Sequence, residues 1–191
     1  MPLPPFDARG LLPPFLGTDE RTAARSPYAA NMSEIVASFA STPLRIQLLK
    51  NLIAYRALLA SDGYLSGLQF IDGSFVENVE VIESRPPRDI DVFSFLNLPG
   101  KYTADPALWA ANGVVFWQNE IADFNKNKLR YSLDTYALSV EGLQLTQLIQ
   151  IVIYWYGLFS HRRATHAWKG FVAIPLDPAG DQAALTALGG P

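Results

Sequence analysis

Two aspartates separated by one apolar residue constrain most strongly what this chain can fold into. Asp89 and Asp91 stand in the stretch DIDVFSFL, whose β-branched and aromatic residues predict a strand over residues 89–96. Side chains two apart on a strand point to the same face, so both carboxylates project together. At about 4 Å two such charges repel by roughly 4 kcal/mol at an effective dielectric near 20. A half-buried strand keeps the pair only if a cation offsets it or one carboxyl stays protonated.

A divalent cation is the first of these solutions. The sequence contains no cysteine, which excludes disulfides, thiolate catalysis and thiolate metal ligands. Oxygen ligands alone favour Mg²⁺ or Mn²⁺. We therefore predict that Asp89 and Asp91 bind metal. The alternative is a solvated edge strand, which Phe93 and Phe95 on the same strand disfavour.

A phosphate-binding turn is predicted at Gly73 and Ser74, directly after the short strand LQFID. Glycine lets the backbone come close to a ligand, and the amides of the following turn can bind phosphate oxygens. Ser74 adds a hydroxyl donor, whereas Asp72 is expected to serve the turn itself. Phosphate-binding amides beside metal-binding carboxylates are typical of phosphoryl or nucleotidyl transfer.

Basic residues near the end of the chain supply further phosphate ligands. Arg162, Arg163 and Lys169 precede the last expected strand, and we predict that Arg163 and Lys169 contact phosphate. The alternative is that they are surface charges. A second cluster, made of Lys126, Lys128 and Arg130, stands near the start of a later strand.

Two segments together resemble a known signature. Ile71-Asp72-Gly73-Ser74 and Asp89-Ile90-Asp91-Val92 are similar to the motif of the DNA polymerase beta-like nucleotidyltransferase superfamily, although the spacer Phe75 to Arg88 is slightly longer than usual. The resemblance implies that Asp89 and Asp91 bind both metals. It also implies that Asp134, in RYSLDTYAL, binds the catalytic metal and helps to deprotonate the acceptor hydroxyl.

A smaller group shows a second resemblance. The motif Leu12-Pro13-Pro14, the central motif and YWYGLFSHRR…WKGF resemble a bacterial group of uncharacterised nucleotidyltransferase-like proteins. This likeness spans most of the chain and implies little about the substrate.

The remaining patterns predict an α/β (α+β) fold with a mixed central sheet flanked by helices. Strands are expected over residues 68–73, 89–96, 130–140 and 171–176. Helices are expected over residues 26–41, 43–60, 106–125, 143–159 and 178–189, with Ser26-Pro27 and Asp177-Pro178 as helix starts. Residues 143–159 are β-like in composition, but their length favours a helix. Residues 76–87 are expected to form a loop or a hairpin connection.

The first 18 residues are expected to form a proline-rich arm, and residues 19–191 a single nucleotidyltransferase-like domain. Proline removes backbone donors and favours an extended path. Apolar neighbours such as Phe6 and Leu12 favour docking on the body; a flexible tail is the alternative. The arm is also a candidate contact for a partner protein.

The sequence therefore predicts a magnesium-dependent nucleotidyltransferase. Its donor is a nucleoside triphosphate, and its acceptor is a hydroxyl of RNA, protein or a small molecule; the resemblance implies a toxin or defence enzyme. With a net charge of −3, an RNA would need a local basic patch. The alternatives are an inactive binding or regulatory module of the same fold and a structural protein assembling through its arm.

The start of the chain and its apolar runs predict where the protein resides. The N-terminus MPLPPFDARG lacks the pattern of a signal peptide. The longest apolar run, Ile151 to Phe159, falls far short of the roughly 18 residues that a membrane span needs. We expect a cytoplasmic protein without a membrane partner.

Overall fold

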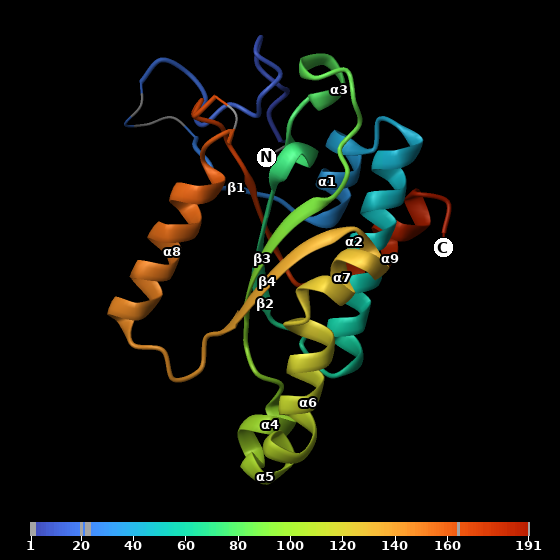
Figure 1. The fold of residues 1–191 in the computed structure, drawn as a ribbon, viewed down its shortest axis with the longest axis vertical. Helices are drawn as coiled ribbons and strands as arrows, with labels where there is room; N and C mark the ends of the chain where they lie inside the picture. Colours follow the sequence, from blue (N-terminus) through green and yellow to red (C-terminus); the bar gives the residue numbers. More distant parts are fainter. Residues whose placement is uncertain (1–2, 20, 22–23, 164, 191) are drawn as a thin grey trace.

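The structure, a computed structural model, describes residues 3–19, 21, 24–163 and 165–190. In this part of the chain five strands form one mixed sheet in the order β1-β5-β2-β3-β4 (Figure 1). The strands are β1 (Tyr28–Ala29), β2 (Gly67–Asp72), β3 (Ile90–Leu96), β4 (Leu133–Ser139) and β5 (Val172–Pro175). Strand β2 runs antiparallel to β3 and β5, whereas β3 with β4 and β1 with β5 are parallel pairs. The predicted mixed α/β architecture is confirmed.

Several helices cover one face of the sheet and form the larger core (Figure 1). They are α1 (Met32–Phe39), α2 (Pro43–Ser61), α7 (Phe124–Tyr131) and α9 (Pro178–Ala187). Alternate residues of the strands, such as Ile71, Val92 and Leu133, point into this core, together with Leu52 of α2 and Ala184 of α9. The expected helices over residues 43–60 and 178–189 are confirmed.

A single helix, α8 (Leu145–Phe159), covers the opposite face (Figure 1). It closes a smaller aromatic core in which Trp155 stacks on Phe93 of β3 with ring centroids 4.2 Å apart. Gln147 and Gln150 are exposed, and the length of this segment was the correct guide whereas its β-like composition was not. The residues that follow α8 lead back to the sheet edge where β2 ends.

Short helical segments fill the two long connections. The link from β2 to β3 contains the 3₁₀ turn η1 (Gly73–Val76) and α3 (Val79–Ile82) rather than a plain loop. After β3 come α4 (Gly100–Ala104) and a continuous helical run that ends at Ile121, earlier than expected. This run consists of α5 (Pro106–Leu108), η2 (Trp109–Gly113), α6 (Val114–Phe116) and η3 (Trp117–Ile121).

Two expected boundaries were wrong. Ser26-Pro27 does not start a helix: it leads into β1, and Asn31 caps α1 in a reciprocal hydrogen-bonded pair with Glu34. The strand expected from Arg130 begins at Leu133, because α7 continues to Tyr131. Ser132, with a φ of 54°, then ends the helix in the left-handed region.

The N-terminal arm lies against the body from residue 3 onward; residues 1–2 are outside the described part. Leu3 and Leu12 are buried in the larger core. The carbonyl of Leu12 accepts a 2.6 Å hydrogen bond from the amide of Gly170, and the carbonyl of Pro13 accepts one from the Tyr28 hydroxyl. The flexible-tail alternative is therefore wrong for these residues. No helix of the described chain is long and apolar enough to cross a membrane.

Candidate functional site

Three aspartates lie side by side at one end of the sheet. Asp72 of β2 is the register partner of Asp91 on β3, and Asp91 is the register partner of Asp134 on β4. Register partners project to the same face of a sheet, so these carboxylates form a row on the face that α8 covers. Asp89 stands one residue before β3, beside this row.

The Gly73 turn lies directly against the middle carboxylate of the row. Gly73 has a φ of +82°, and a Cβ added to it would lie 2.4 Å from Oδ2 of Asp91. No other residue fits there without displacing the carboxylate. Ser74 follows in η1, so the predicted phosphate-binding turn and the predicted metal ligands meet at one point.

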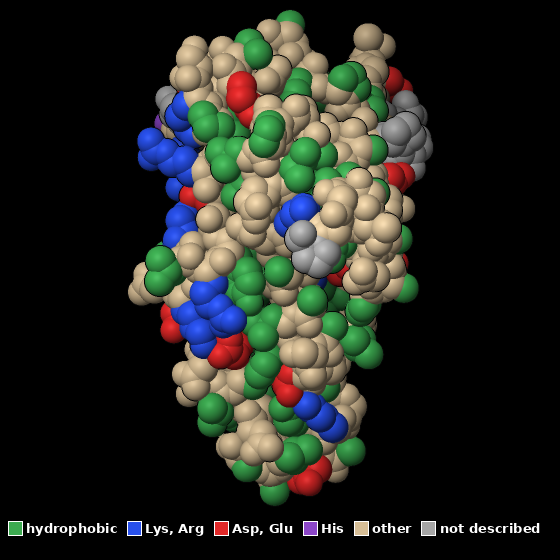
Figure 2. All heavy atoms as spheres, turned by 90° about the vertical axis from the view of Figure 1, so that its right-hand side faces the viewer, with side chains coloured by type: hydrophobic (Ala, Val, Ile, Leu, Met, Phe, Trp, Pro, Cys, Tyr) green, Lys and Arg blue, Asp and Glu red, His purple; other side chains and the backbone are tan. Residues whose placement is uncertain are grey.

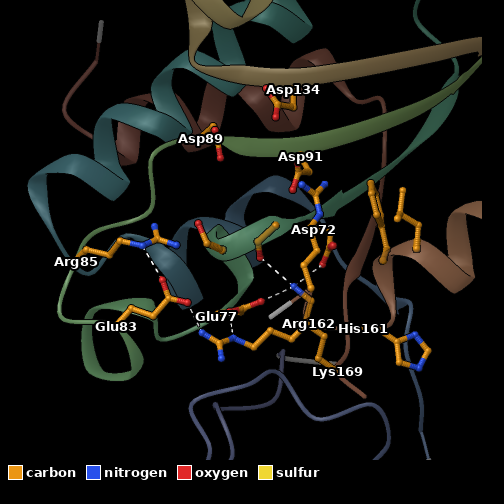
Figure 3. Close-up of a pocket in the computed structure, with 15 residues that line it drawn as sticks. Asp72, Glu77, Glu83, Arg85, Asp89, Asp91, Asp134, His161, Arg162 and Lys169 are labelled. Carbon is orange, nitrogen blue, oxygen red and sulfur yellow. Dashed lines mark hydrogen bonds and ion pairs between the residues drawn. The ribbon is translucent and has the colours of Figure 1, made fainter. Parts of the chain in front are cut away.

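These groups line a cavity of about 290 Å³ (Figure 3). Asp89, Asp91 and Asp134 line it together with Gly73 and Ser74. The residues after α8 line it as well. The arginine and lysine side chains that line the cavity are Arg85, Arg162, Arg163 and Lys169. Every site residue that the sequence predicts therefore lies in this one cavity.

Crowding of negative charge is strongest at Asp91. Burial, followed by the nearby Asp134 and Asp89 carboxylates, raises the pKa of Asp91 to about 6 from its ordinary value of 3.8. The positive charges of Arg163 and Lys169 act in the opposite direction. The Asp89 carboxylate thus contributes to the upward shift of the Asp91 pKa, but less than burial and Asp134 do.

Lys128 is a site residue that the sequence analysis did not assign. Its Nζ forms an ion pair with Asp89 and a second one, at 2.5 Å, with Oδ1 of Asp134. Burial lowers the pKa of Lys128, but the two carboxylates outweigh this effect and the net shift is upward. The signal in the sequence was the basic cluster before the Asp134 strand, which became informative once α7 was known to pack on β4.

Lys169 is buried against the Gly73 turn at the wall of the cavity. Its side chain is 2% exposed, and its Nζ contacts Glu77 at 2.7 Å, the Gly73 carbonyl at 3.1 Å and Oδ1 of Asp72 at 3.1 Å. Burial raises the pKa of Asp72 to about 7. These contacts occupy the ammonium and hold the turn, and the direct phosphate contact expected for Lys169 stays a prediction.

The two adjacent arginines have different environments. Arg162 forms ion pairs with Glu77 and Glu83, which tie it to the connection between β2 and β3. Arg163 is exposed and lines the cavity, and it makes no hydrogen bond or ion pair with any other described residue. Its guanidinium is therefore available to an anionic ligand.

The donor set fits a hard divalent ion in its chemistry. Asp89, Asp91 and Asp134 offer only oxygen ligands, which Mg²⁺ and Mn²⁺ prefer. In the described chain, however, no three His, Cys, Asp or Glu side chains are arranged as a group that could hold a metal ion. The ammonium of Lys128 lies between two of the predicted ligands.

Fold and site together define a mixed α/β protein with an acidic cavity and a glycine turn at the end of its central strands. The chain belongs to the family described as a family of unknown function, DUF6932, whose model matches residues 4–175. No curated protein and no solved structure matches the chain. The matched region runs from the arm to β5 and includes the whole candidate site.

Proposed function

We propose that this protein has a nucleotidyltransferase fold and transfers a nucleoside monophosphate from a nucleoside triphosphate to a hydroxyl group, with Mg²⁺ or Mn²⁺ as cofactor. One observation carries the proposal: the Gly73 turn packs against Asp91, whose partner on the next strand is Asp134. An anion-binding turn beside paired carboxylates is the arrangement that this chemistry requires.

Each residue has a defined role in the proposed site. Asp89, Asp91 and Asp134 would hold the metal, which would supply neutralisation of phosphate charge and activation of the attacking hydroxyl. The Gly73 and Ser74 amides, the Ser74 hydroxyl and the Arg163 guanidinium bind phosphate oxygens. Lys169 is a positioning residue, because its contacts with Asp72 and Glu77 fix the turn from below.

The proposed reaction is a single displacement at the α-phosphorus. The acceptor oxygen forms a bond to the α-phosphorus, and the bond from that phosphorus to the oxygen bridging the β-phosphorus breaks. Pyrophosphate leaves, and the hydroxyl proton passes to the carboxylate of Asp134. The closeness of Asp134 to Asp91 across β3 and β4 supports this assignment.

The acceptor is a hydroxyl of a protein, an RNA or a small molecule, and the proposed setting is a toxin or defence enzyme acting in the cytoplasm. The face that presents α2 and α9 carries its charged side chains in small groups separated by apolar and uncharged surface (Figure 2). Its visible described atoms offer no continuous basic track, so an RNA acceptor would have to bind elsewhere.

The test is incubation of the pure protein with each of the four α-labelled nucleoside triphosphates, Mg²⁺ and total cell extract. We expect a labelled product with the wild type and a loss of at least about 100-fold with Asp91→Ala or Asp134→Asn. Glu141→Gln, just beyond the far end of β4, is the matched control and keeps activity. Full transfer by both aspartate variants would eliminate the proposed site.

A second candidate function is a binding module of the same fold without turnover. The observation that favours it is Lys128, whose ammonium already neutralises Asp89 and Asp134. Calorimetric titration with triphosphates, with and without Mg²⁺, separates the two. The enzyme binds nucleotide more tightly with the metal, whereas the module shows no metal-dependent nucleotide binding.

A further inference from the structure

We propose that Lys128 is an intramolecular counter-ion for Asp89 and Asp134 that disfavours binding of a free divalent metal ion. Its ammonium leaves the two carboxylates only when metal and a polyphosphate bind together. The inference rests on the proposed function and adds to it a coupling between metal binding and polyphosphate binding. Metal and polyphosphate would bind as a pair, each weakly without the other.

The backbone beneath Lys128 is fixed over Asp134. Its neighbour Asn127 is fully buried, and the Asn127 amide nitrogen donates hydrogen bonds to the carbonyls of Glu120 and Ile121 and to Oγ1 of Thr135. Thr135 follows Asp134 on β4. This anchor sets the last turn of α7 against β4 and places the base of the Lys128 side chain beside the carboxylate row.

The Lys128 side chain, in contrast, is partly exposed, and its ammonium is held by its ion pairs with Asp89 and Asp134. The side chain is 39% exposed, and a lysine ammonium on a four-carbon stem can swing into water without disturbing the backbone. A fixed backbone with an ammonium at the end of a flexible side chain suits a counter-ion that must leave the carboxylates and return to them.

The orientation of Lys128 is specific among the basic residues of α7. Lys126 contacts Glu120 and the Asn119 carbonyl, and Arg130 contacts Glu120. Both therefore face the preceding helical run, whereas Lys128 faces the carboxylates. Lys126 provides a matched control for charge, helix and solvent exposure.

The charges explain why metal and polyphosphate would bind together. A free divalent ion must break both carboxylate–ammonium contacts and leaves the displaced ammonium without a partner. A polyphosphate offers the released ammonium, and the Arg163 guanidinium, new anionic partners. Because coupling between two ligands is reciprocal, each then raises the affinity for the other.

The test measures Mn²⁺ binding to the purified full-length protein from the electron paramagnetic resonance signal of free Mn²⁺. Without added anion, we expect Lys128→Met and Lys128→Gln to bind Mn²⁺ at least about tenfold more tightly than the wild type. Lys128→Arg and Lys126→Met should match the wild type. Inorganic tripolyphosphate should tighten Mn²⁺ binding more in the wild type than in Lys128→Met.

Thermal unfolding gives a second readout without turnover. In EDTA, Lys128→Met should unfold at a lower temperature than the wild type, because Asp89 and Asp134 lose their counter-ion; Mn²⁺ should then stabilise the variant more than the wild type. If neither neutral variant gains Mn²⁺ affinity, the inference is overturned, even where the wild type transfers nucleotide. Tighter Mn²⁺ binding without any transfer would support the inference and count against the proposed function.

Discussion

Gly73 is the residue at which backbone conformation and site chemistry depend on each other. Its positive φ excludes most side chains, and the space that a Cβ would need is filled by the carboxylate of Asp91. Gly142 has a similar φ of +75° but nothing within 4 Å of its Cβ position. A comparison of the two glycines therefore separates the cost of placing a side chain at positive φ from the cost of a collision with Asp91.

We predict that Gly73→Ala lowers the free energy of unfolding by about 2 kcal/mol or more, whereas Gly142→Ala costs about 1 kcal/mol, the left-handed strain alone. The excess should vanish in an Asp91→Ala background, because the colliding carboxylate is then absent. Urea denaturation of Gly73→Ala, Gly142→Ala, Asp91→Ala and the double variant of Gly73→Ala with Asp91→Ala measures these costs. Equal costs for the two glycines would mean that the turn does not press on Asp91.

The pKa of Asp91 predicts a pH dependence of stability in metal-free buffer. The native state holds the Asp91 proton more tightly than the unfolded chain, so the contribution of this group is full below pH 3.8 and falls as the pH rises to about 6. We expect Asp91→Asn to gain up to about 3 kcal/mol over the wild type between pH 4 and pH 7. Unfolding free energies measured across this range check it; parallel profiles of the two proteins would contradict it.

At the scale of elements, Lys169 joins the segment before β5 to the turn after β2. We predict that Lys169→Met costs about 3–5 kcal/mol, because the buried Asp72 loses its counter-charge and the buried Glu77 keeps its ion pair with Arg162 but loses the one with Lys169. Asp72→Asn should restore part of the loss. Lys101→Met, which breaks an exposed pair with Asp62, should cost less than about 1 kcal/mol.

Chemical denaturation of these variants measures the differences. A Lys169→Met variant as stable as Lys101→Met would remove the proposed positioning role. The comparison is informative because both lysines pair with an aspartate, whereas Lys169 is buried and has Glu77 as a second carboxylate partner.

The sequence predicted those parts of the fold that have a local cause. Alternation placed Asp89 and Asp91 together, and the length of residues 143–159 identified α8 against its β-like composition. The start of α1 was missed although Asn31 and Glu34 form a capping pair visible in the sequence, because Ser26-Pro27 offered a competing signal. Local rules of this kind fail when two of them apply within a few residues.

The candidate site was predictable in its members but not in their connections. Asp134 came from a family resemblance, and only the register of β3 with β4 places it next to Asp91. The contact of Lys128 with Asp89 joins residues 39 positions apart, so no sequence spacing encodes it. Similarly, the burial of Lys169 depends on Glu77, which the pattern placed in an ordinary connection.

At the scale of the whole molecule, the N-terminal arm has two candidate roles: it completes the fold, or it mediates assembly. Leu12 is fully buried in the larger core, and its carbonyl holds the Gly170 amide just before β5. Lys169, which contacts the Gly73 turn, is the residue before Gly170. The arm is therefore connected to the site through the body of the protein.

We predict that Leu12→Ala costs about 2–5 kcal/mol, the usual cost of a buried leucine, whereas Leu16→Ala, at a position 38% exposed, changes stability by less than about 1 kcal/mol. A chain lacking residues 1–14 should lose its cooperative unfolding transition, because the core and the β5 edge are both opened. Urea denaturation and the mass in solution distinguish the two roles of the arm. A truncated chain that unfolds like the wild type and changes only its mass would show that the arm serves assembly rather than the fold.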